Sequence, residues 1–128
     1  MDPVDGTIEL TIPPDPRLLR LVRLVASGLA STAGFDVDEL DDLRIAVDEA
    51  VTALLEGGNG SNVPMRFEIQ GGQVAMTASI KAADGDPLDA DRLELSTQIL
   101  AAVCDEHDLR VEGGSVQVRI CRRAGERS

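Results

Sequence analysis

The feature that most constrains this chain is a long run of apolar residues at helical spacing between residues 36 and 57. The apolar positions recur every three or four residues and so share one helix face: Leu40, Leu43, Val47, Ala50, Val51 and Leu54. Asp36 followed by Glu39 predicts a capping box at the start, and Gly57-Gly58 predicts the end. The pattern therefore predicts a helix with a buried stripe.

Two further helices are predicted. Asp15 followed by Pro16 indicates a helix start, because Asp caps an unpaired N–H and proline loses no hydrogen bond at the first position. Apolar residues then recur at helical spacing as far as Gly34: Leu18, Val22, Val25 and Leu29. A third helix is expected over about 90–104, with four apolar residues: Leu93, Ile99, Leu100 and Val103.

Five strands are predicted, at about residues 6–12, 63–69, 73–81, 108–112 and 115–122. Gly71-Gly72 and Gly113-Gly114 predict the turns of two hairpins. The order β-α-α-β-β-α-β-β contains neither a repeat nor a linker. We therefore expect one α+β domain over residues 1–122, with 123–128 as a disordered tail.

The composition excludes several classes of function. The 128 residues carry a net charge of −11, which disfavours nucleic-acid binding and docking on an anionic membrane. No apolar run reaches the ~20 residues of a membrane span, and residues 1–15 lack the features of a signal peptide. Two cysteines are too few for a disulfide scaffold, so we expect a cytoplasmic protein with reduced thiols.

The negative charge is concentrated in residues 36–56 and 82–108, each with eight acids and one arginine. Solvated helix faces explain this pattern, and a surface for a basic protein partner is the alternative. One lysine against 11 arginines is typical of GC-rich codon usage, which also explains part of the composition.

Residues 38–52 resemble the RsbW/SpoIIAB family of anti-sigma factors, through Asp-Glu-Leu at 38–40, Leu-Arg at 43–44 and Ala-Val-x-Glu-Ala-Val-Thr at 46–52. The resemblance implies a GHKL (histidine kinase-like ATPase) fold. This fold is a two-layer α/β sandwich whose mixed, mostly antiparallel sheet is covered on one face by about three helices. The family's partners are a sigma factor and a STAS-domain anti-anti-sigma factor, which many members phosphorylate on serine. A homodimer packed partly through the first strand is also implied.

The resemblance implies a catalytic role for Glu49, but the family's Mg²⁺-binding asparagine four residues later is Ala53 here. A methyl group cannot ligate a hard cation that requires oxygen. Glu49 is therefore either a vestige of catalysis or an ordinary acid on a helix surface.

The family's Asp-x-Gly-x-Gly nucleotide loop is also altered, with Ala83 in place of Asp and Pro87 in place of the last Gly. Asp84 and Gly85 remain as candidate nucleotide contacts, and an ordinary loop turn is the alternative. The expected phosphate turn, residues 94–96, has no glycine and begins with Glu94, which would repel phosphate. We expect no cofactor, with ATP and Mg²⁺ bound only if the degenerate site still functions.

Arg17, Arg20 and Arg23 step by three along the first predicted helix. The family resemblance implies that Arg23 occupies the position of an arginine that contacts the partners. The planar guanidinium group of arginine can bind a carboxylate through two hydrogen bonds. The three residues are our candidate partner-binding site, and three solvated arginines are the alternative.

We expect no metal site. His107, the one histidine, is interpreted as a cation at the end of the third helix. Cys104 and Cys121, like Met65 and Met76, are expected to be core residues.

Three functions are compatible with these residues. The favoured one is an anti-sigma-factor-like partner-switching regulator without kinase activity. The alternatives are a Mg-ATP-dependent serine kinase acting on an anti-anti-sigma factor, and a non-catalytic dimerisation or interaction module of the same fold.

Overall fold

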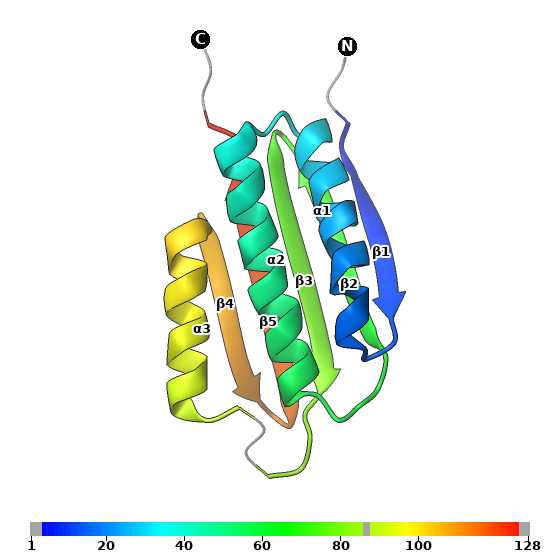
Figure 1. The fold of residues 1–128 in the computed structure, drawn as a ribbon, viewed down its shortest axis with the longest axis vertical. Helices are drawn as coiled ribbons and strands as arrows, with labels where there is room; N and C mark the ends of the chain where they lie inside the picture. The colour runs from blue at the N-terminus through cyan, green and yellow to red at the C-terminus, as the bar shows by residue number, and fades with distance from the viewer. Residues whose placement is uncertain (1–3, 86–87, 126–128) are drawn as a thin grey trace.

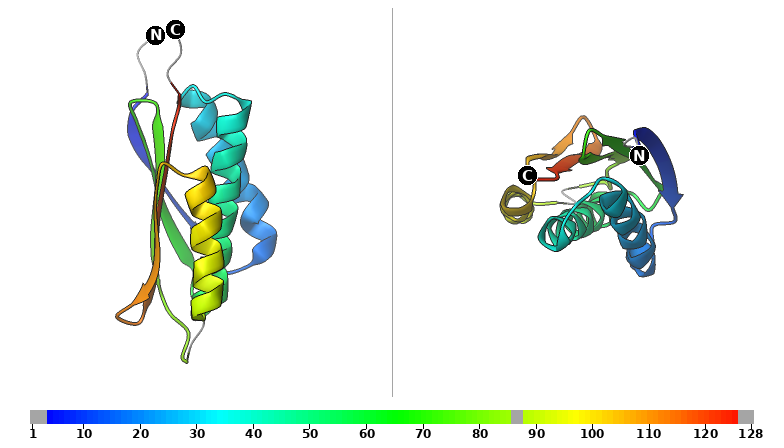
Figure 2. Two further views of the ribbon diagram at one scale, coloured as in Figure 1. Left: turned by 90° about the vertical axis from the view of Figure 1, so that its left-hand side faces the viewer. Right: turned by 90° about the horizontal axis from the view of Figure 1, so that it is seen from above.

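The computed structural model describes residues 4–85 and 88–125, which form two layers (Figure 1). The elements are β1 (Gly6–Ile12), a 3₁₀ turn (Pro16–Leu18), α1 (Leu19–Thr32), α2 (Val37–Gly57), β2 (Val63–Gln70), β3 (Gln73–Lys81), α3 (Ala90–Val103), β4 (Glu106–Glu112) and β5 (Ser115–Arg123). The three helices lie on one face of the sheet and leave the other face uncovered (Figure 2). The predicted α+β sandwich is confirmed.

The sheet has the strand order β1-β2-β3-β5-β4, and its four pairings are all antiparallel. The helices α1 and α2 return the chain beside β1, so β2 runs against β1 and the described strands contain no parallel pair. β2–β3 and β4–β5 are the predicted hairpins. Both residues of each turn have positive φ, 55° and 77° at Gly71-Gly72 and 59° and 76° at Gly113-Gly114, which glycine adopts without strain.

The core lies between the sheet and the helices, and α2 is its central element. Nine of the 21 residues of α2 are buried. The side chains of β2 alternate between buried and exposed, which places Met65 and Phe67 in the core as well. Met76 of β3 is also buried there. Each fully buried large apolar side chain, such as Phe or Met, contributes about 1.5–3 kcal/mol to folding.

The predicted capping box of α2 is confirmed. The Glu39 N–H donates to Asp36 Oδ1 at 2.8 Å, and the Asp36 N–H donates to Glu39 Oε1 at 2.8 Å. Glu39 Oε2 also accepts a hydrogen bond from the Gly125 N–H. The start of α2 is thereby connected to the end of the chain.

Three expected boundaries differ in the structure. The first helix opens with a 3₁₀ turn at Pro16–Leu18, and α1 itself begins at Leu19. β4 begins at Glu106, so His107 pairs with Ile120 inside a strand and is not a cation at a helix end. β5 extends through Arg123, whose N–H donates to Asp105 Oδ2 at 2.7 Å, whereas we had placed Arg123 in a tail. Residues 126–128 of that tail lie outside the described residues.

Candidate functional site

Glu49 lies at the interface between α2 and α3. Its Oε1 accepts hydrogen bonds from Arg92 Nη1 at 2.7 Å and from Ser96 Oγ at 2.6 Å. Arg92 Nη1 also donates to Ser96 Oγ at 2.5 Å, and Arg92 Nε donates to Glu56 Oε2 at 2.9 Å. The Glu49 and Arg92 side chains are only 15% and 24% exposed, and Ser96 is buried. Glu49 is therefore a structural partner of α3 and is not a solvated surface acid.

Arg92 balances two carboxylates at once. Its hydrogen bonds to Glu56 and then to Glu49 raise the pKa of its guanidinium group above the ordinary value. Hydrogen bonds between ionised groups are stronger than neutral ones, especially where water is partly excluded. α3 fully buries only Ser96 and Leu100, and Leu93 and Val103 are partly buried against the core, so this cluster adds polar contacts to the apolar packing of α3.

The Mg²⁺-binding position implied by the family resemblance is Ala53, which lies one turn after Glu49 and is completely buried. The site therefore lacks the oxygen ligand that Mg²⁺ needs there. Leu88 is also buried against the end of α2, since a Cβ added to Gly57 would lie 3.0 Å from Leu88 Cγ. These residues do not fit the Mg²⁺–nucleotide complex that the resemblance implies.

Asp84 and Gly85 lie in the loop after β3 and are both exposed. Asp84 lines a hollow of ≈ 350 Å³ with Gly58, Asn59, Lys81, Ala82 and Ala83. Glu49 is not among the residues that line this hollow. Asp86 and Pro87 lie outside the described residues.

The expected phosphate turn at residues 94–96 is wrong. These residues lie inside α3, which begins at Ala90 with Asp89 as its N-cap. The Arg92 N–H donates to Asp89 Oδ1 at 2.8 Å, so a carboxylate already occupies the start of the helix. An anion approaching the N-terminus of α3 would meet this negative charge.

The three arginines of the candidate partner-binding site have different surroundings. Arg17 is held by its neighbour Asp15, with Nη2 2.6 Å from Oδ2. Arg23 on α1 donates through Nε to Asp48 Oδ1 on α2 at 2.6 Å. Arg20 is exposed and has no ion pair within the described part of the chain. Arg17 and Arg20 also line a hollow of ≈ 520 Å³ at the start of α1.

Exposed apolar side chains accompany these arginines. Leu24 is 69% exposed, and Leu21 is also exposed on the same helix. Arginine is enriched at protein–protein interfaces, so this helix face remains the candidate partner-binding surface.

The sequence pattern did not identify Asp48, Arg92 or Ser96 as members of these sites. Each contacts a residue at least 25 positions away, Arg23 for Asp48 and Glu49 for the other two. Helical periodicity carries no information about such pairs. The sequence offered one signal for this cluster: Arg92 is the one arginine within the acidic segment 82–108.

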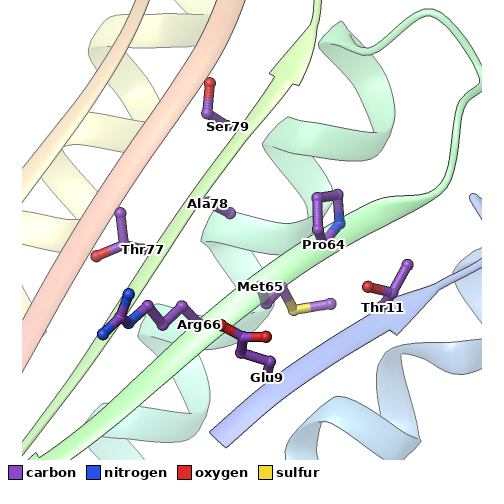
Figure 3. A pocket seen from close by; sticks show the side chains of 8 residues that line it. All are labelled: Glu9, Thr11, Pro64, Met65, Arg66, Thr77, Ala78 and Ser79. Atoms are coloured by element: carbon purple, nitrogen blue, oxygen red, sulfur yellow. The ribbon is translucent and has the colours of Figure 1, made fainter. Parts of the chain in front are cut away.

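The uncovered face of the sheet has a hollow of ≈ 310 Å³ where β2 and β3 diverge (Figure 3). The β2–β3 ladder extends only from Gln70 and Gln73 to Arg66 and Thr77, although both strands continue. Pro64, which has no N–H to donate, lies in the part of β2 that pairs with β1 but not with β3. None of the residues proposed from the sequence lines this hollow.

Both cysteines are free, and both have raised pKa values because burial disfavours the thiolate. Burial raises the pKa of Cys104 to about 12. The thiols therefore act as small apolar groups, as the sequence predicted.

Two kinds of feature were sought within residues 4–85 and 88–125. No group of three or more His, Cys, Asp or Glu side chains in these ranges could hold a metal ion. None of the helices described there combines the length and the apolar character needed to cross a membrane.

A five-stranded antiparallel sheet covered on one face by three helices, with Glu49 on the central helix, defines a domain of the histidine kinase-like ATPase class. Residues 12–121 match the family described as "Histidine kinase-like ATPase domain", and the chain belongs to this family.

The chain is also similar to RsbW proteins, as predicted from residues 38–52. It is 38% identical over 90 residues to "Serine-protein kinase RsbW" of Bacillus subtilis strain 168, covering 66% of this chain and 54% of that protein. It is 34% identical over 94 residues to the protein of the same name from Staphylococcus aureus strain JH9, covering 70% and 57%. The chain thus spans about half the length of the curated relatives it matches.

A solved structure with the same fold contains the RsbU and RsbW domains of a Mycobacterium tuberculosis protein. It matches with a TM-score of 0.71 at 18% identity, over 92% of this chain and 32% of that one. At this identity the likeness establishes the fold.

Proposed function

We propose that this protein is an anti-sigma-factor-like partner-switching regulator that acts without kinase activity. It binds a sigma factor, a STAS-domain anti-anti-sigma factor, or both, in the cytoplasm. The similarity to RsbW proteins supports the regulatory class. The degenerate nucleotide site separates this chain from relatives that are named as kinases.

The observation that carries the proposal is the contact of Glu49 with Arg92 and Ser96 on α3. A catalytic glutamate accepts a proton from an incoming hydroxyl, and here one of the two Glu49 oxygens, Oε1, already accepts two hydrogen bonds. Ala53, buried one turn later, supplies no oxygen for Mg²⁺. Both observations support a regulator without kinase activity.

We propose that partners bind the exposed side of α1 through Arg20, Arg23 and Leu24. In the described contacts, Arg23 donates to Asp48 only through Nε. The two terminal nitrogens of Arg23 therefore remain available for a partner carboxylate. Arg17 contributes less, because Asp15 already binds it. We also propose a homodimer packed through the edge strand β1, where Ile8 is exposed.

Co-purification from the native host with mass spectrometry identifies the partners. Recovery of a sigma factor or a STAS protein is expected. Arg23→Glu should then abolish complex formation while the circular dichroism spectrum stays native. Recovery of neither class of partner would contradict the proposal.

The second candidate is a Mg-ATP-dependent serine kinase, which the names of the curated relatives favour. Isothermal titration calorimetry with ATP and Mg²⁺ separates the two. We expect no binding tighter than roughly 100 μM, a free energy of about −5.5 kcal/mol. Tighter binding would favour the kinase.

A further inference from the structure

Two neighbouring helices, α2 and α3, carry three apolar side chains that are exposed or only half-buried. Ile45 of α2 and Leu95 of α3 are 46% and 52% exposed, and Ile99 of α3 is half-buried. We call these three residues the α2–α3 rim. α1, which carries Leu24 and the arginines, lies on the far side of α2 from α3 (Figure 1).

The contacts of Glu49 fix where these side chains lie. Ile45 lies four residues before Glu49, and Glu56 lies seven residues after it. At these helical spacings the three side chains share one stripe of α2. That stripe borders α3, since Glu49 and Glu56 both bind Arg92. Ile45 therefore lies on the side of α2 that faces α3.

The same reasoning applies to α3. Arg92, Leu95 and Ile99 occupy one stripe at spacings of three and four residues. α3 runs antiparallel to α2, since its start contacts Glu49 and Glu56 while Arg122 joins Asp42 to Asp105 just after its end. Ser96 contacts Glu49, so these two residues mark the same height along the two helices. Ile99 lies one turn after Ser96, and Ile45 lies one turn before Glu49. Because the helices are antiparallel, Ile99 and Ile45 are also at the same height.

Negative charge surrounds the rim. Asp38 of α2 and Asp91 and Glu94 of α3 are exposed and have no ion pair within the described residues. Asp41 has only a long contact of 3.9 Å with Arg44. Arg92, the cation at this edge, is already bound by two carboxylates. The surface is therefore apolar at its centre and acidic around it.

We propose that the α2–α3 rim docks a basic amphipathic helix of a protein partner. The apolar stripe of such a helix would cover Ile45, Leu95 and Ile99, and its flanking lysines or arginines would lie beside the unpaired acids. This surface has the opposite charge to the arginine face of α1. It goes beyond the proposed function and does not depend on it.

The test uses a synthetic 14-residue peptide of leucine and lysine, with the leucines on one helical face, and fluorescence anisotropy at about 50 mM salt. We expect binding in the range of tens of μM, weakened by about tenfold at 300 mM salt because screening shortens the range of charge attraction. A peptide of identical composition with scattered leucines should bind at least about tenfold more weakly.

Ile45→Ser and Leu95→Ser should each weaken binding by about tenfold, since each removes an apolar contact. Val4→Ser is the matched control, because it removes a 56% exposed apolar side chain just before β1, at the opposite edge of the sheet from α3. Its affinity should stay within about twofold of the unchanged protein. Thermal melting verifies that all three variants fold.

Four results would overturn the proposal: no binding at 100 μM peptide, equal binding of the scattered peptide, equal loss in Val4→Ser, or a dimer that Leu95→Ser converts to a monomer. The last result would assign the rim to a second copy of the chain. None of these measurements involves ATP or the arginines of α1, so a failure here is distinguishable from a failure of the proposed function.

Discussion

Arg92 Nη1 on α3 lies 2.7 Å from Glu49 Oε1 on α2, and the pair joins residues 43 positions apart in the sequence. Ser96 completes the contact from the next turn of α3. The glutamate for which the family resemblance implies a catalytic role thus connects two helices here. Its charge is satisfied from within the chain, which has direct consequences for stability.

Arg92→Ala should destabilise the protein by about 2 kcal/mol, because it leaves Glu49 partly buried without its cation. Urea unfolding followed by circular dichroism measures this change. Arg44→Ala is the control, since Arg44 is exposed and its nearest acid is 3.9 Å away. Its effect should stay below about 0.5 kcal/mol. Equal effects in the two variants would contradict the importance of the cluster.

Ser96→Ala should also destabilise the protein, by about 1–2 kcal/mol, because Glu49 loses a hydrogen-bond donor in a buried place. Its effect should not add to that of Arg92→Ala, since both residues contact the same oxygen. A double-mutant cycle in urea gives the coupling. Strict additivity would show that the two contacts act independently.

Asp36→Ala should cost about 1 kcal/mol of unfolding free energy through loss of the capping box. Asp41→Ala, an exposed acid on the same helix, should change it by less than about 0.5 kcal/mol. Thermal unfolding of both variants at the same pH measures the difference. A smaller loss in Asp36→Ala than in Asp41→Ala would be evidence against the cap.

Asp15 should titrate well below ordinary aspartates, because its hydrogen bonds from Arg17 lower its pKa from 3.8 to about 2. A lowered pKa in the folded state means that the ionised carboxylate favours folding. This contribution is complete above pH 3.8 and disappears as the pH falls through about 2. Carboxyl NMR titration measures the pKa directly, and Arg17→Ala should return it towards 3.8.

The cysteines should be unreactive in the native protein. A pKa of about 12 for Cys104, against 9.0 for an ordinary thiol, lowers its thiolate fraction by about a thousandfold. Labelling with a thiol reagent at pH 8 should therefore be slow for the native protein and fast in urea. Rapid labelling of the native protein would show that the thiols are accessible.

Local sequence patterns were sufficient for most of the fold. The capping residues Asp36 and Glu39 and the apolar period after them predicted α2, because each signal acts within a few residues. The paired glycines predicted both hairpins for the same reason. His107 was misassigned because its strand is defined by pairing with Ile120, which no local pattern specifies.

The sequence by itself determined that the Mg²⁺-binding asparagine implied by the family resemblance is replaced by Ala53. The Ala53 side chain cannot ligate Mg²⁺ in any conformation, since a methyl group has no lone pair to offer. Only the tertiary structure decided what Glu49 and Arg23 do. Glu49 binds Arg92 and Ser96, and Arg23 binds Asp48, because packing brings distant helices together and a half-buried charge requires a partner.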